Sequence, residues 1–120
     1  MKLRGSKTEQ EFREELIQSR KGIFGNGDNS NIKITLNSEF PNLVTAYVLH
    51  WTPEQCEDIY IILVNGAHLI SVELDKEGTA NPIVEHLSLE EYKKSSSKIN
   101  QIKLAVALDL SGRDKNEHNN

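Results

Sequence analysis

Hydrophobic residues follow a helical period near the N-terminus and a period of two farther along the chain. Phe12 and Leu16 are spaced one helical turn apart, with charged residues between them. Ser6 and Glu9 precede them at the spacing of a capping box, in which the hydroxyl and the carboxylate each satisfy an unpaired backbone amide. The pattern predicts an amphipathic helix over about residues 7–21.

Residues 22–31 (GIFGNGDNSN) are rich in Gly, Asn and Asp and predict a loop, with Gly22 ending the helix. Gly25 and Gly27 give this loop a slight likeness to a phosphate-binding loop. The Gly-Lys-Ser/Thr ending and the preceding strand of such loops are missing, however. An ordinary connection is the better interpretation.

A period of two begins at Ile32. Hydrophobic residues alternate with polar ones over residues 32–37, the pattern of a half-buried strand. Residues 43–51 are rich in β-branched and aromatic side chains and predict a second strand. Residues 52–58 (TPEQCED) connect it to the next one.

The clearest local signal is Asn65-Gly66, which lies between two strand patterns at 59–64 and 67–74. This dipeptide favours a tight hairpin because both residues accept positive φ. Residues 59–64 are apolar on both faces, which predicts a central strand. The second strand alternates and exposes Glu73.

After the hairpin, Gly78 and Pro82 predict a turn over residues 75–82, and residues 83–84 a short strand. Ser88 and Glu91 repeat the capping-box spacing, which predicts a helix that begins near Leu89.

Residues 99–110 fit two patterns. Alternate residues from Ile102 to Leu110 are hydrophobic, as in a strand, but Ile99, Ile102, Val106 and Leu110 also form a helical stripe. The Gln, Lys, Leu and Ala content favours a helix ended by Gly112. The predicted architecture is α+β: a mainly antiparallel sheet of about four strands, an N-terminal helix and one or two C-terminal helices. Residues 1–112 form this single domain, and the polar residues 113–120 are expected to be disordered.

The net charge of −4 is unevenly distributed. Residues 34–92 hold ten acids and one base, Lys76, whereas bases outnumber acids in residues 1–33 and 93–120. A surface of one sign repels nucleic acid and anionic lipid and attracts basic proteins. The simpler explanation is an acidic face that keeps the protein in solution.

Several classes of protein are disfavoured by the sequence. No apolar run approaches the ~20 residues that cross a bilayer, and no signal peptide is recognisable. One cysteine, Cys56, cannot form an internal disulfide, which favours the reducing cytoplasm. No metal-ligand spacing links the candidate ligands His50, Cys56, His68 and His86.

Catalysis would require Cys56 as a nucleophile, His68 or His86 as its base, and Asp58 or Asp75 to orient that base. Nothing in the sequence brings these residues together. We therefore expect no catalytic residue, no metal and no cofactor.

The segments YIILVNGAHLISVELD and SLEEYKKSSSKINQIKLAVAL resemble small α+β immunity proteins of bacterial contact-dependent growth inhibition and related polymorphic toxin systems. The resemblance covers less than half of the chain and carries no site residue across. It implies a cytoplasmic protein that neutralises one cognate protein toxin, often a nuclease, by covering its active site or the surface that holds RNA or DNA.

Such a toxin is basic where it binds phosphate, so acids would meet it. We expect the partner to be a basic, nuclease-like toxin, with neither nucleic acid nor a membrane bound directly. The predicted partner-binding residues project from the hairpin and its flanking loops, with an aromatic anchor: Trp51, Glu54, Glu57, Asp58, Glu73, Asp75, Glu77 and Glu85. Two alternatives remain: an adapter or oligomeric subunit of a cytosolic complex, and an enzyme dependent on Cys56.

Overall fold

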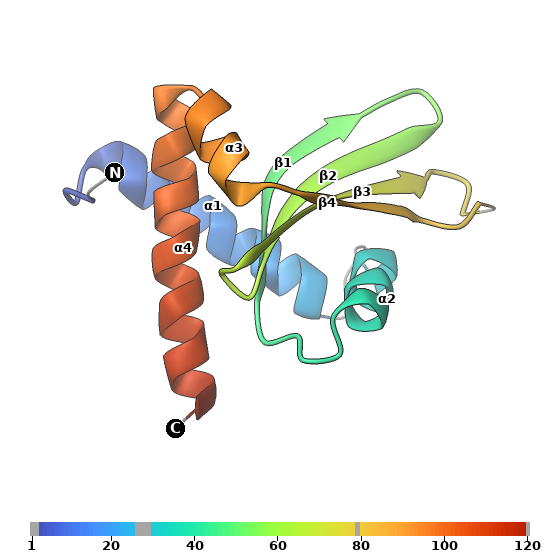
Figure 1. Cartoon of the computed structure of the whole chain (residues 1–120), viewed down its shortest axis with the longest axis horizontal. Coiled ribbons are helices and arrows are strands. Elements are labelled where there is room, and N and C mark those ends of the chain that lie inside the picture. The colour runs from blue at the N-terminus through green and yellow to red at the C-terminus, as the bar shows by residue number, and fades with distance from the viewer. Residues whose placement is uncertain (1–2, 26–29, 79, 120) are drawn as a thin grey trace.

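The computed structural model of the chain describes residues 3–25, 30–78 and 80–119. The α+β class is confirmed, with an N-terminal helix, one antiparallel sheet and C-terminal helices (Figure 1). The elements in chain order are α1 (Lys7–Phe24), α2 (Ser30–Glu39), β1 (Ala46–Pro53), β2 (Glu57–Val64), β3 (His68–Asp75), β4 (Ile83–Leu87), α3 (Leu89–Ser95) and α4 (Lys98–Asn119).

The four strands pair in the order β1-β2-β3-β4, each antiparallel to the next. The predicted hairpin is confirmed: Val64 pairs with His68, and Asn65 and Gly66 have φ values of +54° and +67°. A Cβ on Gly66 would lie 2.9 Å from Cβ of Ser111 in α4. Glycine is therefore required here both for its backbone conformation and for close packing.

Each face of the sheet covers a separate core. The first core lies among the sheet, α1 and α4, and its central side chains are Leu16, Tyr47, Leu63, Leu69 and Leu104. The second lies on the opposite face, against α2 and the end of α1, and contains Ile23, Ile32, Leu36, Ile62 and Ile70. In Figure 1, the β1–β2 and β3–β4 turns project well beyond α4.

The predicted strand over residues 32–37 is wrong, because these residues belong to α2. Ile32 and Leu36, one helical turn apart, are fully buried against the sheet, while Ile34 is 66% exposed. An apolar side chain at every second position fits a strand, but only two of the three are in the core. The need to cover the second face of the sheet decides in favour of the helix.

The end predicted for the last helix is also wrong. The helical interpretation of residues 99–110 is confirmed, but α4 continues past Gly112 to Asn119, through the segment expected to be disordered. Asp114 holds this end: its Oδ2 accepts a hydrogen bond from Thr45 Oγ1 (2.6 Å) and one from the Tyr47 hydroxyl. Arg20 Nε lies 3.5 Å from the same oxygen.

The predicted N-terminal helix is confirmed, and so is its capping box at Ser6 and Glu9. It runs beyond Gly22 to Phe24, and Gly25 is its C-cap. The loop predicted for residues 22–31 is therefore helical at both of its ends, and residues 26–29 lie outside the described part of the chain. Ser88 accepts a hydrogen bond from Glu91 N at the start of α3, as its spacing predicts.

Candidate functional site

The predicted partner-binding residues gather at the end of the sheet that projects beyond α4. Because consecutive strands are antiparallel, the β1–β2 turn and the β3–β4 turn lie at the same end. Glu54 lies in the first turn and Glu77 in the second, and both are exposed. The backbone amide of Lys76 donates to the carbonyl of Cys56 (3.0 Å), which ties the two turns together.

Four of the predicted acids share one face of the sheet. Closer to α4, the same face carries the first core. Glu57 lies directly opposite Asp75, Glu73 lies between Ile59 and Ile83, and Glu85 lies opposite Ser71. Side chains of paired residues point to the same side of a sheet. We call this surface the acidic sheet face and define it by Glu57, Ile59, Glu73, Asp75, Ile83 and Glu85.

The acids of this face are close neighbours of one another. Glu57 and Asp75 are a directly opposed pair of like charges, and Glu73 is diagonal to both Glu57 and Glu85. Within the described part of the chain, neither Glu57, Glu73 nor Glu85 forms an ion pair. Directly opposed like charges destabilise a sheet by roughly 0.2–1 kcal/mol. The arrangement therefore costs stability in the free protein.

Models of protein families, curated proteins and solved structures give no match to this chain. The geometry and charge of the acidic sheet face are therefore the basis on which a function is proposed.

Two predicted acids have structural roles at the turns. Asp75 accepts hydrogen bonds from the backbone amides of Glu77 (3.4 Å) and Ala80 (3.1 Å), which fix the β3–β4 turn. Asp58 points to the opposite face, where its Oδ1 accepts from Trp51 Nε1 (3.1 Å) and lies 3.9 Å from Lys76 Nζ. These contacts leave Glu57, Glu73 and Glu85 as the acids of the sheet without an internal partner among the described residues.

Trp51 is separated from the acidic sheet face. It pairs with Tyr60 on the opposite side of the sheet, and the two rings are stacked with centroids 6.4 Å apart. Burial, followed by the nearby charge of Asp58, raises the pKa of Tyr60 above its ordinary value. The indole is 58% exposed, so it is available to a partner, but not to one that covers only the acidic sheet face.

The arrangement needed for a cysteine nucleophile is not assembled among the described residues. Cys56 is exposed in the β1–β2 turn, whereas His68 begins β3 at the opposite end of the sheet. The length of β2 places them about 26 Å apart. His68 and His86 instead contact Phe40, with ring centroids 5.3 and 5.9 Å away.

The described residues contain neither a group of metal ligands nor a membrane-spanning helix. Across residues 3–25, 30–78 and 80–119, no three His, Cys, Asp or Glu side chains are grouped as a metal ion would require. Among the helices in these ranges, none combines the length and hydrophobicity needed to cross a bilayer.

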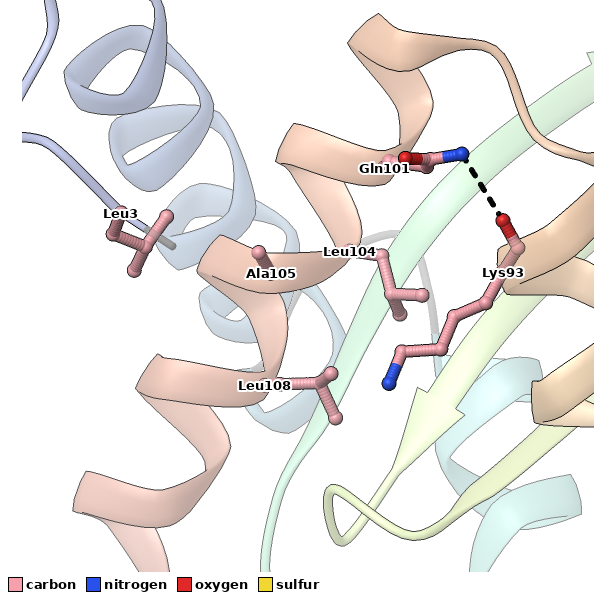
Figure 2. A pocket seen from close by; sticks show the side chains of 6 residues that line it. All are labelled: Leu3, Lys93, Gln101, Leu104, Ala105 and Leu108. Carbon is pink, nitrogen blue, oxygen red and sulfur yellow. Dashed lines mark hydrogen bonds between the residues drawn. The ribbon is translucent and has the colours of Figure 1, made fainter. Parts of the chain in front are cut away.

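Among the surface hollows of the described residues, two contain charged side chains and lie beside α4, away from the acidic sheet face. The first, of about 360 Å³, is shown in Figure 2. The side chains of Leu104 and Leu108 extend from the side of α4 that faces Lys93 of α3. The polar groups of this hollow hold α3 against α4, since Gln101 Nε2 donates to the carbonyls of Lys93 (3.2 Å) and Ser96 (3.1 Å). The amide of Gln101 is therefore occupied by these two structural hydrogen bonds.

The second hollow, of about 570 Å³, lies beside the irregularity in β1 between Val48 and His50. Its two charged residues form an ion pair, in which Lys103 Nζ lies 2.8 Å from Glu15 Oε1. Burial, followed by the charge of Lys103, lowers the pKa of His50 below its ordinary value. The hollow therefore presents a neutral histidine and a closed ion pair at neutral pH.

Sequence reasoning missed two members of the acidic sheet face, Ile59 and Ile83. Ile59 was included in a strand that appeared buried on both faces, yet α4 does not reach this end of the sheet. Ile83 is 58% exposed. The available signal was the spacing of Ile83 and Glu85. They are two residues apart in β4, which places an apolar and an acidic side chain on the same face.

Proposed function

We propose that this chain is an immunity protein that neutralises a cognate toxin by covering a basic surface of the toxin with the acidic sheet face. One observation carries the proposal: Glu57, Glu73 and Glu85 adjoin one another on one sheet face without a cationic partner in the described chain. Glu85 is exposed, and Glu57 and Glu73 are partly exposed. Acids placed only for solubility are better spread apart, because clustering destabilises the free protein. A basic partner would relieve the repulsion.

The apolar members of the face support a binding role. Ile59 and Ile83 flank Glu73 in the same row across three strands. Interfaces commonly combine an apolar centre with surrounding charges that steer association. The proposed partner is a nuclease-like toxin whose phosphate-binding surface is basic, and the proposed compartment is the cytoplasm. Covering that surface excludes the nucleic acid substrate, so the immunity protein needs no catalytic residue.

The test uses the toxin domain encoded beside the gene for this chain. Expression of this toxin domain alone should arrest growth, and co-expression of the chain should restore it. The triple variant Glu57→Gln, Glu73→Gln, Glu85→Gln should bind the toxin about tenfold more slowly at low ionic strength, because steering is lost. It should also unfold at the same or a slightly higher denaturant concentration, because repulsion is relieved.

A matched control changes the net charge equally at exposed sites elsewhere: Glu11→Gln, Glu90→Gln, Glu117→Gln. The control should associate with the toxin at nearly the native rate. Equal slowing in both triple variants would show that overall charge, not this face, governs association. A neighbouring gene that encodes no toxin, or a toxin that the chain does not inhibit, would contradict the immunity function itself.

An adapter is the second candidate, and the position of Trp51 favours it. The indole and the acidic sheet face lie on opposite sides of the same sheet, so two different proteins could be bound at once. In an adapter, Trp51→Ala and the Glu-to-Gln triple variant should each abolish the binding of a different protein. In an immunity protein with one partner, only the acidic sheet face should be essential.

A further inference from the structure

The two edge strands of the sheet, β1 and β4, differ in how far other parts of the chain protect them. At the β1 edge, Ser19 Oγ of α1 accepts a hydrogen bond from the backbone amide of Val48 (3.2 Å), and the register of β1 is irregular between Val48 and His50. A covering helix and an irregular strand are two ways in which proteins protect an edge from further pairing. The β1 edge is therefore protected around Val48 and His50.

The β4 edge is open. All five residues of β4 pair regularly with β3, and no strand lies beyond β4 in the sheet. In the described part of the chain, no backbone hydrogen bond from another segment reaches β4 on its outer side. Alternate residues of an edge strand turn their N–H and C=O groups outward. These groups form a template for another strand, and β4 carries no lysine to block it.

We infer that the outer edge of β4 receives an extended, basic segment of the partner as a fifth strand. The inference rests on the proposed function, because it assigns a binding mode to the same basic partner. Ile83, Glu85 and Leu87 point to one side of β4. An added strand would place a Lys or Arg opposite Glu85 and apolar residues opposite Ile83 and Leu87. The favoured segment therefore carries an apolar, a basic and an apolar residue at every second position.

A second copy of the chain is a poorer occupant of this edge. Antiparallel pairing of two β4 strands about their centres would place Glu85 opposite the same residue of the other copy. Glu73, diagonal to Glu85 in β3, adds to the negative charge on this side. Directly opposed like charges disfavour pairing, whereas a basic side chain at the same position favours it. Charge complementarity therefore selects a basic strand.

The probe is a short synthetic peptide with Val, Lys and Val at alternate positions and Thr between them. Hydrogen exchange of the full chain is measured with and without peptide. The Lys peptide should slow exchange of β4 amides, and replacing its Lys with Glu should weaken binding about fivefold. Methylating the amides of the Lys peptide that face β4 should abolish the protection, because the hydrogen bonds of the ladder can no longer form.

The variant Glu85→Lys should reverse the preference, so that the Glu peptide binds better than the Lys peptide. Unchanged exchange in the central strand β2 will show that the variant remains folded. No protection of β4 at saturating peptide, or equal protection by methylated peptide, would overturn the inference. Concentration-dependent protection without peptide would assign the edge to a second copy instead.

The outcomes are separable from those of the proposed function. If the toxin binds through Glu57 and Glu73 while the β4 amides remain unprotected, the added strand is wrong and the acidic sheet face stands. If β4 accepts the Lys peptide but the chain inhibits no toxin, the edge is a binding site and the immunity function is wrong.

Discussion

Replacing Asp114 with Ala should strongly destabilise the fold, although the sequence around it gives no sign of an ordered structure. Asp114 lies near the end of α4, where its Oδ2 accepts hydrogen bonds from the hydroxyls of Thr45 and Tyr47. Thr45 is fully buried and Tyr47 is 1% exposed. Loss of the carboxylate leaves both hydroxyl donors without this acceptor.

The magnitude follows from the two buried donors. Each unsatisfied buried group costs about 1–3 kcal/mol. The Asp114 side chain is 19% exposed, so water can partly replace it and the lower half of that range applies. The higher helix propensity of Ala offsets about 0.5 kcal/mol. The expected loss in the free energy of unfolding is about 2–3 kcal/mol, with little added by the partly exposed Arg20.

Urea denaturation followed by circular dichroism measures this loss. Glu117→Ala is the matched control, because it removes the same charge from an exposed position of the same helix. It should change stability by no more than about 0.5 kcal/mol. Combining Asp114→Ala with Tyr47→Phe should cost less than the sum of the two single changes. Equal stability of Asp114→Ala and Glu117→Ala would refute the anchoring of α4.

Three further predictions concern the β2–β3 turn and two titratable side chains, Tyr47 and His50. Gly66→Ala should destabilise the protein by about 2 kcal/mol in the same denaturation assay, because φ is positive and the new Cβ would meet Ser111. Burial, followed by the hydrogen bond to Asp114, raises the pKa of Tyr47 from 10.0 to about 12. The folded state keeps this proton where the unfolded state loses it, so stability should fall between pH 10 and 12, and Tyr47→Phe should remove that fall. The His50 titration followed by NMR should have its midpoint below 6.5, and Lys103→Gln should move it upward; stability linked to this group declines as the pH drops below 6.5.

The features that could be predicted from the sequence are set by neighbouring residues. Asn65-Gly66 specifies a hairpin because few other residues accept positive φ, and Ser6 with Glu9 specifies a helix start through its own hydrogen bonds. The helical interpretation of the C-terminal stretch is confirmed, and two residues of the expected stripe, Val106 and Leu110, are buried, whereas Ile99 is 56% exposed. Leu104, Ala107 and Ser111 complete the buried side of the helix.

The errors lie where distant contacts decide the structure. The sheet has two apolar faces, and the second face is covered by α2 although its residues alternate as in a strand. The end of α4 is polar, yet Asp114 finds two hydroxyl donors on a segment 67 and 69 residues away. Neither partner is visible in a local pattern, so tertiary contacts override propensity at both sites.

The acidic middle of the chain shows why charge alone did not define the site. Consecutive residues of a strand point to opposite faces, so Glu57 and Asp58 are adjacent in sequence yet separated by the sheet. Pairing brings Glu57, Glu73 and Glu85 together from three strands and sends Asp58 with Trp51 to the other side. Among the acids without internal partners, Glu85 lies in the open edge strand β4 and Glu73 in the neighbouring strand β3. The other edge of the sheet is protected by α1 at Val48. A basic partner that pairs with this edge would meet the acidic sheet face in the same contact, which is why the two proposals are best tested on one complex.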